Sequence, residues 1–128
     1  MPNLIDKLEK VDNYFRTVEF YSFANVKELP QKSGVYCIYR GNEEIYVGIT
    51  DNLLRRLNEK FINEFKIPLD KKANAKHHIG AYHIQKKYPN SVPIDYSFRY
   101  FVEDDLNLYS LYERYLICLY EETILNVK

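Results

Sequence analysis

The sequence has no tryptophan, one methionine, two cysteines and four glycines in 128 residues. Two cysteines, Cys37 and Cys118, are too few for a disulfide framework, which indicates a reducing compartment such as the cytoplasm. No apolar run approaches the ~18 residues of a transmembrane helix, and the N-terminal segment has no apolar core of signal-peptide length. We therefore expect a soluble cytoplasmic protein with no membrane partner.

The sequence also has no net charge, since 18 basic residues balance 18 acidic ones. The charges are unevenly placed: residues 55–88 contain nine Lys or Arg and three acids, whereas residues 103–122 contain six acids and one Arg. This distribution is typical of a polarised molecule that binds nucleic acid, and also of two solvated helix faces. Charge alone therefore leaves nucleic-acid binding open.

Tyrosine is abundant, at 13 residues. A tyrosine fits a half-buried surface, where its ring packs and its hydroxyl meets water or a polar ligand. A biased base composition of the gene explains the excess equally well. The three histidines have no cysteine partners and no helical spacing suited to zinc, so a zinc site is not expected.

The length predicts one domain, 1–128, that buries a core without disulfides or metals. Hydrophobic periodicity predicts an N-terminal helix over about 3–23 with Asn3 as its N-cap. It also predicts a second helix that begins at Thr50 or Asp51 as N-cap. The remaining predicted elements are strands at 35–39, 44–47 and 94–102, a basic loop at 66–76, and helices at 77–88 and 106–122. This order predicts a mixed α/β (α+β) domain in which helices flank a small sheet.

Two short motifs, GVY at 34–36 and YVG at 46–48, resemble the signature motifs of the GIY-YIG nuclease family. The segment "ITDNLLRRL" resembles that family's capped helix, whose arginine follows the glycine by eight residues and falls here at Arg56. The family's helical glutamate falls at Glu113 in "YERYLI", and its late asparagine falls at Asn126. The ordered set of motifs is far more specific than either triplet by itself.

The resemblance extends over roughly 28–127 and implies a three-stranded antiparallel sheet flanked by helices. It also implies a metal-dependent endonuclease that hydrolyses phosphodiester bonds in nucleic acid, expected to be DNA, with Mg²⁺ or Mn²⁺. In that case Tyr36 activates the attacking water, Tyr46 orients it, Arg56 clamps the scissile phosphate and Glu113 holds the metal. These side chains suit that chemistry, because a guanidinium matches a phosphate and one carboxylate with waters is a usual magnesium site.

The two tyrosines can share a face of the hairpin only if the numbers of paired residues sum to an even value, because side chains alternate along a strand. A two-residue turn at Gly41-Asn42 pairs Arg40 with Glu43 and gives an odd sum. We therefore predict a three-residue loop with Gly41 or Asn42 at positive φ. The glycines at the strand ends are interpreted as leaving room for a phosphate beside the tyrosines.

Further residues are candidates for contacts with the nucleic-acid backbone, by resemblance or by charge. They are Gly48, Arg55, Lys60, Lys71, Lys72, Lys76, His77 and Asn126. Two positions depart from the family's pattern, because Lys60 stands where a histidine or tyrosine is common and Ile49 where a polar residue is common.

Two other functions remain open. A nucleic-acid-binding module of the same fold without catalysis is one, although four intact motif residues favour an enzyme. A regulatory domain that binds a protein through its tyrosine-rich surface is the other, and it predicts a large apolar patch away from the tyrosines. A homodimer or a larger complex is a possible assembly.

Overall fold

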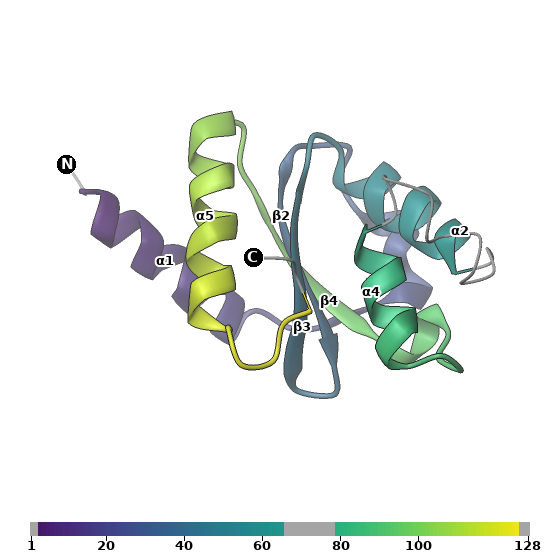
Figure 1. Cartoon of the computed structure of the whole chain (residues 1–128). Coiled ribbons are helices and arrows are strands. Elements are labelled where there is room, and N and C mark those ends of the chain that lie inside the picture. Colours follow the sequence, from purple (N-terminus) through teal and green to yellow (C-terminus); the bar gives the residue numbers. More distant parts are fainter. Residues whose placement is uncertain (1–2, 66–78, 126–128) are drawn as a thin grey trace.

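The computed structural model describes residues 3–65 and 79–125 and shows a sheet between two layers of helices (Figure 1). The elements in chain order are α1 (Leu4–Thr17), β1 (Tyr21–Ser22), the 3₁₀ helix η1 (Phe23–Glu28), β2 (Gly34–Arg40), β3 (Glu43–Thr50), the π-helix η2 (Arg55–Phe61), α2 (Ile62–Glu64), α4 (Ile79–Lys87), the 3₁₀ helix η3 (Pro93–Asp95), β4 (Ser97–Val102) and α5 (Leu106–Leu119). None of the helices in this part of the chain is long and apolar enough to span a membrane.

The sheet has the strand order β1-β4-β2-β3, and every neighbouring pair is antiparallel. Three of these strands are those expected from the sequence, so the α+β prediction is confirmed. The fourth, β1, is a two-residue strand that pairs Tyr21 with Phe98 at the edge of the sheet. It lies where a helix was predicted.

The hairpin of β2 and β3 has the even register that places both motif tyrosines on one face. Tyr36 pairs with Gly48 and Ile38 with Tyr46, so the paired numbers sum to 84. The predicted three-residue loop is wrong, however, because Arg40 pairs with Glu43 across a two-residue turn. Gly41 has the predicted positive φ, at 63°, as the first position of a type II′ turn requires.

A β-bulge reconciles the two-residue turn with the even register. The pairing shifts between Ile38 and Tyr39, which leaves Ile45 as an extra residue in β3. An extra residue changes the parity of the pairing beyond it and bends the strand. Ile45 and its neighbour Tyr46 consequently pack on the same side of the sheet. The carbonyl oxygen of Ile45 also accepts a hydrogen bond of 2.7 Å from the Leu125 N–H of the C-terminal tail.

Each face of the sheet has its own apolar core. One face packs against η1, η2 and α4 and is called the α4-side core here; from β2 it receives Tyr36 and Ile38. The other packs against α1 and α5 and is called the α5-side core; from β2 it receives Val35, Cys37 and Tyr39. Figure 1 shows α1 and α5 on one side of the strands and η2, α2 and α4 on the other.

The first helix begins as predicted, since the Asn3 side chain accepts a hydrogen bond from the Asp6 N–H in a capping box. It ends at Thr17 rather than near residue 23, so the predicted end is wrong. The physical reason is that Tyr21 and Ser22 are extended and gain backbone hydrogen bonds from β4. Tertiary pairing therefore outweighs the helical spacing of the apolar residues.

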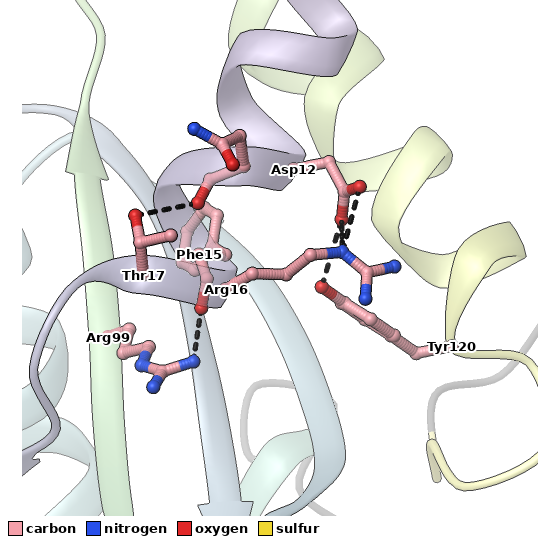
Figure 2. Close-up of polar contacts among 7 residues, drawn as sticks. Asp12, Phe15, Arg16, Thr17, Arg99 and Tyr120 are labelled. Atoms are coloured by element: carbon pink, nitrogen blue, oxygen red, sulfur yellow. Dashed lines mark hydrogen bonds and ion pairs between the residues drawn. The ribbon is translucent and has the colours of Figure 1, made fainter.

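Polar contacts dock α1 onto β4 and α5 (Figure 2). The Asp12 carboxylate accepts hydrogen bonds from Arg16 Nε at 3.0 Å and from the Tyr120 hydroxyl at 3.3 Å. The Arg99 guanidinium donates to the Phe15 carbonyl oxygen in the last turn of α1. A cation at the C-terminal end of a helix also suits the helix dipole.

Candidate active site

The two motif tyrosines lie side by side on the α4 side of the sheet. Their ring centroids are 6.4 Å apart, with an angle of 32° between the ring planes. Both rings are almost completely buried, with 3% of Tyr36 and 7% of Tyr46 exposed. The β-bulge is what makes them neighbours, because without it the even register would not follow from a two-residue turn.

Gly48 lies directly beneath the Tyr36 ring. A Cβ placed on Gly48 would overlap the Cζ and hydroxyl oxygen of Tyr36. The missing side chain therefore makes room for the phenol of Tyr36, where the sequence interpretation placed a phosphate. At the start of β2, near the same end of the hairpin, a Cβ on Gly34 would overlap the Phe101 carbonyl oxygen. The glycine at this position therefore allows β2 and β4 to pack closely.

Arg56 reaches this pair of tyrosines from η2. Its Nε donates a hydrogen bond to the Tyr36 hydroxyl at 3.2 Å, and its side chain is half-buried. A guanidinium has five N–H donors, and a phenol hydroxyl has one donor and two acceptor sites. The same two groups can therefore hold each other and bind a phosphate oxygen or a water.

Arg56 comes from the second helix, but the cap of this helix is not the predicted one. The Asn52 side chain accepts a hydrogen bond from the Arg55 N–H at 3.1 Å, and the Thr50 hydroxyl accepts one from the Asn52 N–H at 3.1 Å. Asp51 instead forms an ion pair with the Arg55 side chain at 2.5 Å. Asn52 is thus a positioning residue that sequence analysis missed, although an asparagine before an apolar helical run is a usual cap signal.

The turn that follows the cap is a π-helix, Arg55–Phe61. Turns of this kind are rare in proteins, and those that occur are often found at functional sites. Leu57 and Phe61 are buried on its inner side, whereas Arg55 and Lys60 are exposed. Exposure leaves both cations available for contacts with a ligand at the surface, although Arg55 already pairs with Asp51.

Glu113 lies apart from the tyrosines, on α5, which packs against the opposite face of the sheet. Its carboxylate is half-buried and forms no hydrogen bond or ion pair with any residue in 3–65 or 79–125. Partial burial raises the pKa of this carboxyl group above its usual value, and the neighbouring Arg114 offsets part of that rise. A desolvated carboxylate without a donor is a group that gains from binding a cation.

The described residues contain no cluster of three or more His, Cys, Asp or Glu side chains that could hold a metal. An all-protein cage of ligands is therefore absent from this part of the chain. The single carboxylate of Glu113 fits a magnesium ion that keeps most of its waters and takes its other ligand from a phosphate. Several candidate contacts with the nucleic-acid backbone lie outside the described residues: Lys71, Lys72, Lys76, His77 and Asn126.

Comparisons with known proteins agree with this geometry at the level of the fold. No family model matches the sequence, and no curated protein matches it. Solved structures do match, among them the GIY-YIG N-terminal endonuclease domain of UvrC from Thermotoga maritima. A point mutant of that domain, bound to its catalytic divalent cation, has a TM-score of 0.55 and 18% identity over 82% of this chain and 93% of that one. The magnesium-bound domain has a TM-score of 0.51 and 18% identity over 81% and 93%.

The chain therefore has the fold of GIY-YIG endonuclease domains, as the motifs GVY and YVG predicted. The UvrC domain with that fold is described as an endonuclease bound to its catalytic divalent cation. At this level of identity the match concerns the backbone, so the chemistry of this chain must rest on its own side chains.

Proposed function

We propose that this chain is a metal-dependent endonuclease that hydrolyses phosphodiester bonds in nucleic acid, with DNA as the expected substrate. The observation that carries the proposal is the hydrogen bond of 3.2 Å between Arg56 and the Tyr36 hydroxyl, next to Tyr46. It joins a phosphate-binding cation to a group that can hold water. A purely structural tyrosine pair in a core does not require a half-buried arginine at its edge.

In this mechanism Arg56 binds a non-bridging oxygen of the scissile phosphate and stabilises the negative charge that grows there. The hydroxyls of Tyr36 and Tyr46 hold a water in line with the bond to be cut. The water oxygen bonds to phosphorus as the bond to the leaving sugar oxygen breaks. Because Arg56 also fixes Tyr36, one side chain aligns the water and the phosphate together.

Glu113 is the residue proposed to hold the divalent metal. Its half-buried carboxylate without a hydrogen-bond donor supports that role. A bound Mg²⁺ or Mn²⁺ supplies charge stabilisation for the leaving oxygen. Because Glu113 lies on α5 and Arg56 on the other side of the sheet, the phosphate is proposed to lie beside the outer strand β3, between these two residues.

The backbone of the nucleic acid is proposed to follow the basic segment 55–88. Arg55 and Lys60 are exposed at its start, on the same turn as Arg56. Such contacts bind every sequence equally and weaken with salt.

Both cysteines are free thiols, which supports a reducing compartment such as the cytoplasm.

A cleavage assay with plasmid and oligonucleotide substrates in Mg²⁺ or Mn²⁺ tests the proposal. We expect Arg56→Ala to lower cleavage about 100- to 1,000-fold, as loss of a transition-state donor does. Glu113→Gln should lower cleavage by a similar factor and weaken the dependence on metal concentration. Arg16→Ala is the matched control, because it removes an exposed arginine from α1, outside the segment 55–88, and should leave the rate unchanged.

Equal activity in all four proteins would identify a contaminating nuclease and reject the assignment. The alternative of a binding module predicts a different outcome. In that case no protein cleaves, yet the wild type still binds nucleic acid with a strong salt dependence.

A further inference from the structure

A second cluster of cations and aromatic rings lies at the far end of β2 from Tyr36. It is a surface notch of about 330 Å³ where the turn end of β2 meets the last turn of α4 and the loop after it. Arg40 enters the notch from β2, and Lys87 and Tyr88 enter it from the end of α4. The candidate active site uses none of these residues.

The Arg40 side chain is held in place by aromatic groups. Its Cζ lies 4.0 Å from the centroid of the Tyr88 ring, and its Nη1 donates to the Tyr96 hydroxyl at 3.5 Å. The Tyr96 hydroxyl donates to Ser91 Oγ at 2.5 Å, and Ser91 Oγ donates to the Tyr88 carbonyl oxygen at 2.8 Å. A guanidinium stacked on a ring is pre-organised, and its N–H groups point outward in the plane of the fork.

The positive charge of this notch is only partly balanced by the described protein. No carboxylate in residues 3–65 or 79–125 forms an ion pair with Arg40 or Lys87. Asp95 lines the same notch, but its carboxylate accepts a hydrogen bond of 2.8 Å from the Val92 N–H. Two cations, one of them fixed, thus meet one acid that already has a donor. An anion with a planar pair of oxygens fits this arrangement.

The notch opens on the same side of the sheet as the tyrosine pair. Arg40 follows Tyr36 by four residues in β2, and side chains four apart in a strand share a face. Both contact the α4-side core, since the partners of Arg40, Tyr88 and Tyr96, pack there. The separation along the strand is about 13 Å, so a nucleic-acid strand bound beside Tyr36 reaches the notch within a few nucleotides.

We propose that the Arg40–Lys87 notch is a second phosphate-binding subsite, which holds the substrate strand a few nucleotides from the scissile phosphate. The proposal rests on the proposed function, because it places the same nucleic acid that Arg56 binds. The fork of Arg40 binds a phosphodiester oxygen pair, and Lys87 adds a point charge. The subsite positions the strand and takes no part in the chemistry.

The first experiment is a fluorescence-anisotropy titration of a short fluorescein-labelled DNA duplex with the full chain in EDTA, repeated over a series of salt concentrations. We expect Arg40→Gln to weaken binding about fivefold. The negative slope of log K against log salt should become less steep by about 0.9. Lys87→Gln should change both in the same direction. Lys10→Gln is the matched control, because it removes an exposed lysine from α1 on the opposite face and should change neither.

Arg40→Lys tests whether the effect of Arg40→Gln comes from a lost contact or from misfolding. It keeps the charge but loses the planar fork, so the salt slope should persist while affinity falls in part. Inorganic phosphate added at constant ionic strength distinguishes a strand subsite from a free-phosphate site. We expect inorganic phosphate to compete only weakly with the DNA, and to the same extent in wild type and Arg40→Gln. Strong competition in wild type that is lost in Arg40→Gln would mean that the notch binds a small phosphate ligand instead of a strand, and would overturn the proposal.

The second experiment measures cleavage with Mg²⁺ on duplexes that extend different distances from the cut. Arg40→Gln should raise KM about fivefold with kcat unchanged, and only when the duplex reaches the notch. If Arg40→Gln matches Lys10→Gln in slope, affinity and KM while wild type binds and cleaves, the notch proposal fails and the proposed function stands. If wild type neither binds nor cleaves nucleic acid, both fail.

Discussion

Strand β2 presents a tyrosine to each side of the sheet, and the two residues have very different surroundings. Tyr36 on the α4 side accepts a hydrogen bond from Arg56. Tyr39 on the α5 side is 1% exposed, and although Cys37 and Arg99 lie near its hydroxyl, no hydrogen bond of good geometry reaches it within the described chain. Burial raises the pKa of Tyr39 well above the usual range. Two identical side chains, three residues apart, thus differ in whether their polar end has a partner.

The arginines beside these tyrosines differ in the same way. Arg56 contacts the hydroxyl of Tyr36, whereas Arg99 lies over rings, with its Cζ 3.8 Å from the Phe20 centroid and 5.1 Å from that of Tyr39. Arg99 also donates to the Phe15 carbonyl oxygen, so it holds α1 on the sheet (Figure 2). On the α5 side the arginine and the tyrosine pack among other rings, whereas on the α4 side they form a hydrogen-bonded pair that is proposed to bind the substrate.

Removing each tyrosine hydroxyl in turn is the most direct test of this difference between the two faces. Tyr36→Phe should lower the rate of cleavage about 100-fold or more, because a group that orients the attacking water is lost. Tyr39→Phe should leave cleavage unchanged and increase the free energy of unfolding by about 1 kcal/mol, because a buried hydroxyl without a partner disappears. Single-turnover cleavage and urea unfolding of both variants measure the two effects. Equal loss of activity in both variants would contradict the division between the faces.

The glycines of the hairpin provide the next test. Gly48→Ala places a Cβ inside the Tyr36 ring, so the ring must move. We expect a destabilisation of about 1–3 kcal/mol and a loss of cleavage of about 100-fold from the displaced hydroxyl. Gly41→Ala is the control, since its Cβ enters open space but its φ of 63° is strained. It should cost about 1 kcal/mol with no change in the cleavage rate.

Arg99→Met tests the packing role of the α5 side with a smaller expected effect. The Phe15 carbonyl oxygen loses its donor and Phe20 loses the stacked cation, which should destabilise the fold by about 1–3 kcal/mol. The rate of cleavage by the folded protein should stay at the wild-type level. Arg16→Met, which removes an exposed pair with Asp12, should cost about 0.5 kcal/mol or less. A cleavage defect in folded Arg99→Met would show that this arginine serves the chemistry as well as packing.

The smallest expected effect concerns Glu113 and pH. Because the pKa of Glu113 is raised in the folded state, folding favours its protonated form, and the metal-free wild type loses stability as pH rises from the ordinary glutamate range through the raised value. Glu113→Gln stays neutral at every pH. We expect its melting temperature in EDTA to exceed that of wild type by a few degrees or less at neutral pH, with no difference in acid. Differential scanning calorimetry over a pH series measures this, and Arg114→Gln is the control that should destabilise the charged form of Glu113.

Much of the fold could be predicted from the sequence because its signals are local. Asn3 caps the first helix as predicted, and Asp105, an aspartate directly before an apolar helical run, caps the last one. The shared face of Tyr36 and Tyr46, which the family resemblance required, is confirmed, but it arises from a bulge and not from the predicted three-residue loop. Arg56 lies beside Tyr36 because it belongs to the first turn of the helix that follows β3, where its N–H donates to the Asn52 carbonyl oxygen. The short connection leaves little freedom to place it elsewhere.

What could not be predicted depends on tertiary contacts. The bulge at Ile45 was missed because an extra residue in a strand leaves no mark in an apolar run, and its carbonyl oxygen is bound by Leu125 from the other end of the chain. The early end of α1 depends on strand pairing of Tyr21 with Phe98. The roles of Tyr36, Tyr46, Arg56 and Glu113 stay predictions that the cleavage assay tests.

The β-bulge also has a consequence for how this hairpin can be re-engineered and how it can diverge. Residues 39–44 form a tip whose odd pairing is converted to the even pairing below it by Ile45 alone. Any two-residue turn grafted onto the tip therefore leaves Tyr36 and Tyr46 adjacent, so long as Ile45 stays outside the ladder. If Ile45 instead paired with Ile38, Tyr46 would pair with Cys37 and turn toward α5. Deleting Ile45 leaves Tyr46 opposite Ile38, so the loss of this one codon keeps the two tyrosines on one face.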